Sequence, residues 1–576
     1  MFSRVGRYRL AVPEAAPLRV RRPLHVANVQ DPPVAVHYMS LVVAFALLLY
    51  ITRTQWFYFD EWAFLTDRGF AGQPLDLFRP HNEHWSTIPI LIYRALFALF
   101  AVRSYLPYMA VLLLIHIAVA HLLWRLMRRE GVDGWVATSL SAVFLVFGAG
   151  WENLIWAFQI GVLGSLAFGL VALLVVATDV VLTPVRQGAI WFLLICGLMC
   201  SGIGVTMVAV VAVAVLLRRG PRKAAITVAL PAAVYIVWLL LVGRRGLGGV
   251  PITAGSLVNL PGYVWTGISS TLDGLSGFIG AGAALAVALL AWWIWKRHDA
   301  AIHASAFAGS VGVLVFYIIN GLGRAALGVA EATSARYVYI GGALLLPTIG
   351  WAITQVARRD LLARLAVLGV MAFSATQGIA QLWGQAREQH VPKAQAERQI
   401  LAASRLLESG APVLGYQPDP VLAPELTVNE LDQLRRDGDL PSGVTLSKAD
   451  QLSAVAGLQT TFTDSPALPF GGVHAATVVG ALSSRGSDNC LHLQSIGGTI
   501  AIRLTYDSPA AISFISPTDG KLEFFLQVNG DVTNTANPIS TELMTASAKF
   551  LNVLPANATP YIETAIPNLT VCGLIP

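Results

Sequence analysis

Two adjacent carboxylates lie in the aromatic segment FYFDEWAFL, residues 57–65. Asp60 and Glu61 directly follow the first long apolar run of the chain. Apolar surroundings and a neighbour of like charge both raise the pKa of a carboxyl group. Either side chain is therefore suited to act as a general base toward a hydroxyl group. The alternative is structural, because an acidic residue here also stabilises the first turn of the helix that follows.

A second polar cluster is RPHNEHWS, residues 79–86. His81, Glu83 and His84 are residue types that bind divalent cations, although their spacing matches no established metal motif. A magnesium, manganese or calcium ion is one prediction for this segment. Together with Asn82, the same side chains are also suited to hold a sugar or a phosphate. The remaining alternative is that they are solvated loop residues.

Two further clusters combine polar and aromatic side chains. GWENLIWAFQ (150–159) is typical either of an aromatic anchor at a membrane interface or of a carbohydrate contact. SARYVYIGG (334–342) begins with an arginine, whose planar fork matches a phosphate; the alternative is that such arginines reach lipid head groups. Other arginines lie at the ends of apolar runs that are expected on the same side of the membrane. The candidate binding residues are therefore Trp151, Glu152, Asn153, Arg336, Tyr337, Arg324, Arg244 and Arg245.

Long apolar runs must position these clusters. The chain is 55% hydrophobic and 12% charged, whereas soluble domains carry about 25% charged residues, and a bilayer core takes about 20 apolar residues per helix. The predicted fold class is a polytopic α-helical membrane protein. Its eleven predicted spans are 36–54, 105–126, 134–150, 157–179, 188–201, 204–218, 224–243, 278–296, 303–321, 337–355 and 362–383.

The basic residues set the expected orientation. They are dispersed at the ends of the apolar runs, which is typical of membrane orientation and not of nucleic-acid binding. The arginine-rich tail 1–35 has no signal-peptide core and is expected to be cytoplasmic. The acid pair then lies in an outer loop, 55–104, in which residues 86–102 form a helix in the membrane interface. The C-terminus is expected outside a bacterial plasma membrane.

The composition changes after the last span. Residues 36–384 are predicted to form the transmembrane domain. Residues 385–454 contain helix-like stretches and are predicted to form a helical linker between this domain and the remainder of the chain. Residues 455–576 show short β-favourable runs between turn residues, which predicts a small extracytoplasmic β-sandwich. Outside the cytosol, Cys490 and Cys572 can form one disulfide. Cys196 and Cys200 are expected to pack in an apolar segment as small residues.

This pattern resembles the GT-C glycosyltransferases, which take sugars from polyprenyl-phosphate donors. The resemblance covers residues 36–384 as architecture and is carried by the acid pair after the first span, by residues 79–85 and by 334–339. The order Asp60-Glu61 is similar to that of the protein O-mannosyltransferase branch. The C-terminal region resembles accessory domains of actinobacterial arabinosyltransferases, and the WWDYG-like signature of oligosaccharyltransferases is not found in the sequence.

The resemblance implies an inverting transfer to a glycan, lipid or protein acceptor. Asp60 would deprotonate the acceptor hydroxyl, and Glu61 would assist it or orient the acceptor or a metal. The charge of the leaving lipid phosphate would be met by Arg336, with Arg324 or the pair Arg244 and Arg245. His81, Glu83 and His84 would line the acceptor or metal side. The alternatives are a transporter or flippase of lipid-linked sugars, and a non-catalytic envelope scaffold.

Overall fold

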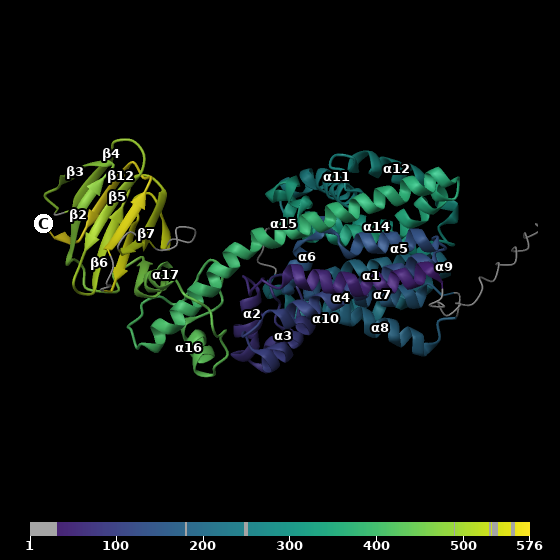
Figure 1. Ribbon diagram of the computed structural model, residues 1–576, viewed down its shortest axis with the longest axis horizontal. Coiled ribbons are helices and arrows are strands. Elements are labelled where there is room, and N and C mark those ends of the chain that lie inside the picture. The colour runs from purple at the N-terminus through teal and green to yellow at the C-terminus, as the bar shows by residue number, and fades with distance from the viewer. Residues whose placement is uncertain are drawn as a thin grey trace, which may run out of the picture.

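The computed structural model consists of a helical bundle and a C-terminal β-domain, which are connected by one long helix, α15 (Figure 1). It describes residues 31–178, 181–246, 252–488, 490–528, 531–532, 539–554 and 559–575. Residues 1–30 of the predicted cytoplasmic tail lie outside the described residues. The first helix, α1, begins at Pro32 and ends at Thr52.

The bundle is built from apolar helices whose outer faces remain hydrophobic. Exposed Val42 and Val43 on α1 and exposed Leu240 and Leu241 on α10 are examples, and such surfaces are stable only against lipid or another apolar partner. The remaining long helices are α4 (Leu106–Arg129), α5 (Gly134–Leu145), α7 (Ile160–Val176), α8 (Pro184–Leu198), α9 (Ile203–Arg219), α10 (Pro221–Leu241), α11 (Ala254–Ser276), α12 (Gly282–Trp295), α13 (Ala304–Arg324), α14 (Ala335–Ala357) and α15 (Leu361–Glu408).

Seven described helices or helical segments are long and apolar enough to cross a membrane, which fits a membrane protein with several spans. They are α1, α4, η4 with α7, α10, α13 with η7, α14 and α15. The other four predicted spans correspond to α5, α8, α9 and α12, which contain 12 to 17 residues. A helix of 12 residues is only about 18 Å long, against a bilayer core of about 30 Å. The count of eleven crossings is therefore not confirmed.

Short helices and loops connect the long helices. In the segment predicted as an outer loop, α3 forms a 14-residue helix where an interfacial helix was expected, and it packs against α2 and α4. The short elements of the bundle are α2 (Glu61–Leu65), η1 (Thr66–Phe70), η2 (Pro74–Phe78), α3 (Thr87–Phe100), η3 (Gly148–Gly150), α6 (Glu152–Ile155), η4 (Ala157–Gln159), η5 (Gly243–Gly246), η6 (Arg297–Asp299), η7 (Ala325–Leu327) and η8 (Val329–Thr333).

The two ends of the bundle carry different polar clusters. At the end nearest the β-domain, which we call the domain-facing end, lie the loops 53–105, 147–159, 199–203 and 324–336 (Figure 1). At the opposite end, Glu130 is fully buried. Its carboxylate lies 3.3 Å from Nη2 of Arg218 and 3.5 Å from Nδ1 of His303. This acid therefore connects α4, α9 and the start of α13.

Helix α15 runs without a break through residue 384, where a boundary between membrane domain and linker was predicted. Two short helices follow it, α16 (Val428–Arg436) and α17 (Lys448–Gln459). Each begins with a capping box, in which a Thr or Ser side chain and an acidic residue three positions later bond each other's backbone. The linker segment is thus folded and packs beside the bundle, as the contacts below show.

The β-domain consists of two packed sheets with a shared core. The six-stranded sheet has the order β1-β10-β6-β12-β4-β3, and the second has β13-β2-β5-β11-β7-β8 with β9 on β7. In β5, Ile500, Ile502 and Leu504 are buried in the core and alternate with side chains on the other face, as expected for a sheet with one buried face. The predicted β-rich C-terminal region is confirmed.

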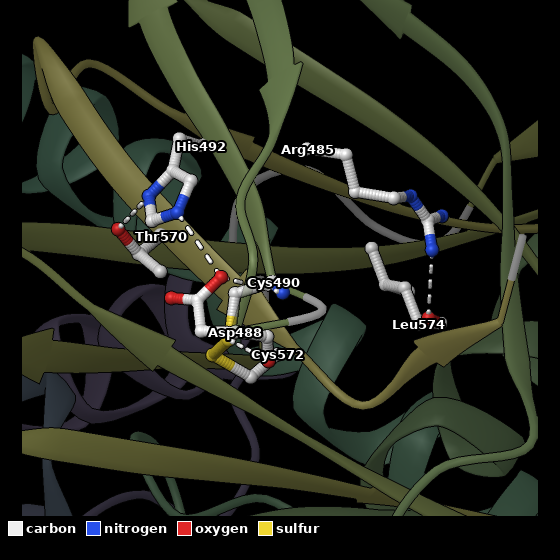
Figure 2. The surroundings of a disulfide bond; sticks show 7 residues. All are labelled: Arg485, Asp488, Cys490, His492, Thr570, Cys572 and Leu574. Atoms are coloured by element: carbon white, nitrogen blue, oxygen red, sulfur yellow. Dashed lines mark hydrogen bonds and ion pairs between the residues drawn. A yellow bond between two sulfur atoms is a disulfide. The ribbon is translucent and has the colours of Figure 1, made fainter.

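The strands are β1 (Thr460–Thr463), β2 (Val473–Val479), β3 (Ala481–Arg485), β4 (Leu491–Ser495), β5 (Ile500–Thr505), β6 (Ala510–Ile515), β7 (Gly520–Val528), β8 (Asp531–Val532), β9 (Ile539–Leu543), β10 (Ala548–Val553), β11 (Thr559–Thr564), β12 (Asn568–Cys572) and β13 (Leu574–Ile575). All paired strands run antiparallel except β13 and β2. One disulfide joins Cys490 to Cys572, as the sequence suggested (Figure 2). Beside it, Nε2 of His492 lies 3.4 Å from Asp488, and its Nδ1 lies 3.1 Å from the Thr570 hydroxyl.

The other two cysteines are free, and Cys200 is buried against α7, where a Cβ added to Gly164 would lie 3.2 Å from its sulfur. Close packing against a glycine is consistent with the expected role of a small apolar residue.

Candidate active site

Glu61 is fully buried and accepts four hydrogen bonds. Its Oε1 accepts from the hydroxyls of Tyr93 at 2.6 Å and Tyr105 at 2.8 Å. Its Oε2 accepts from the backbone N–H of Tyr58 at 2.9 Å and from Nε1 of Trp156 at 3.2 Å. Burial raises the pKa of Glu61 to about 7, although these donors and a nearby lysine oppose the rise. With both oxygens occupied, this carboxylate fixes the loop to the middle of α3 and to the ends of α4 and α6.

Asp60 is in a different environment, although it is the next residue. Its side chain is 27% exposed, and Nε2 of His81 lies 3.8 Å from its Oδ1. Asp60 is at the N-cap position of α2, but its side chain makes no capping hydrogen bond. The capping interpretation therefore does not account for this residue. One carboxylate of the pair is held by four hydrogen bonds, and the other is partly exposed.

The backbone immediately before Asp60 is strained. Phe59 has a φ of 53°, in the left-handed region that bulky side chains rarely adopt. Its N–H donates to the carbonyl of Leu422 at 2.8 Å. Strained backbone of this kind persists only where surrounding contacts hold it, and it is concentrated at functional sites.

The 79–86 segment folds back as a tight turn. His81 and His84 exchange two backbone hydrogen bonds of 2.9 Å, and Asn82 occupies the turn with a φ of 50°. Asparagine tolerates this conformation better than most residues. The His81 ring is buried edge-on against Phe64 and Phe158. Asn82 itself is exposed, so the structure gives it a role in the turn.

The second histidine of this turn faces two arginines. Glu83 lies 3.8 Å from Nε2 of His84 and 3.3 Å from Nη2 of Arg324. Burial of its Nδ1 edge lowers the pKa of His84, and the charges of Arg324 and Arg336 lower it further, while Glu83 raises it. Three parts of the chain that are far apart in the sequence thus lie close together: the turn 81–84, Arg324 and Arg336.

Arg336 connects this group to the 150–159 segment. Its Nη1 lies 3.6 Å from Glu152, its guanidinium stacks 5.2 Å from the Tyr337 ring, and its carbonyl accepts from Nδ2 of Asn153 at 3.2 Å. Trp151 is half-buried and lines a cavity of about 510 Å³ between α11, α14 and α15. The predicted binding residues from these two clusters are therefore adjacent.

Three buried nitrogens at this place have no hydrogen-bond partner among the described residues. They are Nε2 of His81, Nδ1 of His84 and Nε of Arg336. A buried polar atom without a partner is costly, and a bound group or water usually satisfies it. We call this group, together with Arg324, the cationic cradle. Its two guanidinium groups already face the carboxylates of Glu83 and Glu152. The nitrogens that remain without a partner are suited to donate to an anion with several oxygens, such as a phosphate.

Two predicted residues are not brought into the cradle. Arg244 and Arg245 lie exposed on η5, and within the described ranges neither makes a hydrogen bond or ion pair with the cradle. Their helix nevertheless lies close by, because a Cβ on Gly246 would meet the carbonyl oxygen of Asn82 at 1.8 Å.

No three His, Cys, Asp or Glu side chains converge as a metal site anywhere in the part of the chain that the structure describes. His81, Glu83 and His84 lie in one turn, but His81 faces Asp60, whereas Glu83 contacts both His84 and Arg324. The divalent cation stays a prediction.

Sequence reasoning missed several residues of this site. Tyr93 and Tyr105 bind Glu61, yet they are single tyrosines within apolar segments and carry no local signal. Lys393 is only 2% exposed, and its Nζ donates to Gln55 at 3.0 Å and to the carbonyl of Ile155 at 3.4 Å. A lone lysine beyond the last predicted span was assigned to the linker, and only the fold reveals its partners.

Comparisons of the chain with models of known families, with curated proteins and with solved structures find no match.

Proposed function

We propose that this protein is a membrane-embedded glycosyltransferase of the GT-C type. It moves a sugar from a polyprenyl-phosphate donor to a hydroxyl of a cell-envelope glycan, lipid or protein. The observation that carries the proposal is the position of Asp60, a partly exposed carboxylate 3.8 Å from His81, at the edge of the cationic cradle. A base and an anion site side by side are what such a transfer requires.

The reaction is a displacement at the anomeric carbon of the donor. The acceptor oxygen forms a new bond to this carbon while its proton passes to Asp60. The bond from the anomeric carbon to the phosphate oxygen breaks, and its electron pair leaves with the polyprenyl phosphate. The attack comes from the side opposite the leaving group, so the configuration inverts.

The cradle meets the charge that develops on the leaving phosphate. Arg336 offers an Nε without a hydrogen-bond partner, and His84 offers its buried Nδ1, whereas Nε2 of His81 faces Asp60. Donors that are fixed before the reaction stabilise developing charge without reorganisation. Glu61 holds the loop and is not the base, because both of its oxygens are already occupied.

The proposed orientation places this site at the outer face of a bacterial plasma membrane, with eleven crossings and the β-domain outside. Support comes from the charges at the opposite end of the bundle. Arg129, Arg218 and Arg219 lie there against the ends of α4 and α7. Clusters of arginine beside spans favour the cytoplasmic side.

A transport function would favour charged groups near the middle of the spans. The buried acids described above lie instead at the two ends of the bundle, Glu61 at one and Glu130 at the other. This distribution favours chemistry at a membrane face over transport through the bundle.

The test replaces Asp60→Asn and, as a matched control, exposed Asp437→Asn at the end of α16. Membranes containing each variant are supplied with radiolabelled polyprenyl-phosphate pentoses and hexoses, and label in glycan, lipid and protein fractions is counted. Loss of a general base costs about 10²- to 10⁴-fold. We expect that loss for Asp60→Asn and unchanged transfer for Asp437→Asn.

Wild-type transfer by Asp60→Asn at the same protein level would contradict the mechanism. Movement of the labelled lipid across vesicles without any new glycosidic bond would instead support the transporter alternative.

A further inference from the structure

The helix that leads to the β-domain packs directly on the loop that carries the acid pair. Nε2 of Gln55 donates to the carbonyl of Ala386 at 2.8 Å, and Nδ1 of His390 lies 2.7 Å from the carbonyl of Thr54. These contacts join residues more than 330 positions apart in the sequence. They lie on α15 beyond residue 383, where its predicted membrane-spanning part ends.

Lys393 lies at the centre of this contact. Its ammonium group donates to Gln55 and to the carbonyl of Ile155, and it lies 5.4 Å from the centre of the Tyr58 ring. Burial lowers the pKa of Lys393, while the negative charges of Glu61 and Glu152 raise it. A buried ammonium is stable only if it is paired and hydrogen-bonded. Here the ammonium donates two hydrogen bonds and is influenced by the charges of Glu61 and Glu152, which belong to the proposed site.

The segment after α15 holds the loop from its other side. The carbonyl of Leu422 accepts the N–H of Phe59 at 2.8 Å, and the carbonyl of Glu425 accepts the Thr66 hydroxyl at 3.0 Å. The turn at Leu422 is itself fixed, because Asp419 accepts its N–H at 2.9 Å. The strained residue before Asp60 is thus held by backbone that lies 363 positions later in the chain.

We infer that Lys393 is a positioning residue for Asp60, and that residues 386–425 belong to the catalytic unit and not to a linker. Lys393 contacts Gln55, Tyr58 and the carbonyl of Ile155 together. These contacts fix the conformation of the loop from Gln55 to Glu61. The ammonium is enclosed, so it does not touch substrate. The role in catalysis rests on the proposed function, whereas the anchoring of the loop does not.

The first experiment measures the loop alone, by hydrogen–deuterium exchange of the full-length protein in lipid nanodiscs. The variant is Lys393→Met, which keeps most of the side-chain volume and removes the charge. The matched control is Lys448→Met, an exposed lysine at the start of α17. We expect residues 54–66 to exchange about tenfold faster in Lys393→Met, with the β-domain unchanged, since exchange reports local opening.

The second experiment measures sugar transfer in the same preparations. We expect kcat to fall about tenfold in Lys393→Met while the donor KM changes less than about twofold, because substrate contacts remain. In the Asp60→Asn background, Lys393→Met should cause no further loss, since residues acting through one group are not additive. Where Lys393→Met does not fold, Lys393→Gln removes the charge but keeps a hydrogen-bond donor for Gln55, and it is expected to change exchange and kcat in the same direction by less.

The outcomes separate the two claims. Unchanged exchange at residues 54–66 overturns the positioning role, whatever the transfer assay shows. Faster exchange in a protein whose wild type transfers no sugar confirms the anchor and overturns the proposed function. An additional loss in the Asp60→Asn background would show that Lys393 acts by another route and would overturn its role through Asp60.

Discussion

Asp60 and Glu61 share a peptide bond, but their surroundings give them different chemistry. Glu61 meets four donors and no solvent, whereas Asp60 keeps an open face beside His81. A buried carboxylate with all its acceptor positions in use is suited to hold structure. A partly exposed one can exchange a proton with a substrate. Adjacent residues in the sequence are therefore not equivalent candidates for catalysis.

The pKa of Glu61 predicts how stability depends on pH. Burial raises this pKa from 4.5 to about 7 in the folded protein. The group therefore contributes stability that is fully present below about pH 4.5 and is lost as the pH rises through about 7. Replacing Glu61→Gln removes the titration. Its amide oxygen can accept from Tyr58 and Trp156, and its NH₂ can donate to a tyrosine hydroxyl.

We expect the thermal unfolding midpoint of the wild type to fall by several degrees relative to Glu61→Gln over this pH range. The measurement is intrinsic tryptophan fluorescence of both proteins in the same detergent between pH 4.5 and 8. Only the difference between the two curves is interpreted, so other titrating groups cancel. Parallel curves would show that Glu61 does not titrate in this range.

The residues of the site differ in how far the sequence reveals them. Asp60, His81 and Arg336 each lie in a local run of unusual composition, and the structure brings the first two together, with the third beside His84. Lys393 has no such run, and its partners are 338 and 238 positions away. Local patterns mark what a residue can do, but only tertiary packing decides which residues meet.

At the scale of helices, a single buried acid ties three elements together at the end of the bundle opposite the proposed site. Glu130 terminates α4, contacts Arg218 at the end of α9 and lies near His303, whose ring stacks on Trp351 of α14 at 3.9 Å. Breaking a buried ion pair by removing one partner costs about 3–5 kcal/mol, because the other charge stays buried. This contact should matter for stability and not for chemistry.

We therefore expect Glu130→Ala to lower the free energy of unfolding of the bundle by about 3–5 kcal/mol, and its unfolding midpoint with it. Residual transfer activity per folded molecule should be unchanged. The control is Glu408→Ala, an exposed acid at the end of α15, with no expected effect. Stability is measured by thermal unfolding in detergent. Transfer is measured about 20 °C below the wild-type midpoint, because a loss of several kcal/mol lowers Tm by many degrees and the variant must still be folded. A stable Glu130→Ala variant would show that the remaining contacts of Arg218, which include the carbonyl of Ala177, are enough to hold its charge.

The helices themselves were largely predictable, because each apolar run of membrane length must form a helix to satisfy its backbone. Helix lengths were less predictable. The 134–150 run becomes the 12-residue α5 followed by the short η3, since Gly148 and Gly150 pack tightly against α15 and Tyr339. The predicted linker likewise begins inside α15, because the sequence becomes polar after about residue 385 while the helix continues to Glu408.

At the scale of the whole molecule, the bundle and the segment that leads to the β-domain pack against each other. Helix α15 and the segment after it contact the acid-pair loop. Arg103 at the end of the same loop pairs with Asp439 at 2.7 Å. The β-domain is thus attached to the face of the bundle where the proposed chemistry takes place. If one is outside the cell, so is the other.

This arrangement makes the orientation testable with two single cysteines in a background where Cys196 and Cys200 are replaced by Ala. Asp437→Cys reports the domain-facing end, and Arg359→Cys reports the opposite end, because α14 separates Arg359 from the cradle. Cys490 and Cys572 are joined as a disulfide and do not react. The positive-inside rule predicts that Arg359 faces the cytosol.

A membrane-impermeant maleimide added to intact cells should therefore label position 437 and leave position 359 unlabelled until the membrane is opened. Labelling at 359 alone would place Asp60 and the cradle in the cytosol. A polyprenyl-phosphate sugar in the outer leaflet would then be out of reach, and the proposed function would fail although every side-chain contact of the site remained. Labelling of 437 alone leaves the base, the anion site and an outer-leaflet donor on the same side of the membrane.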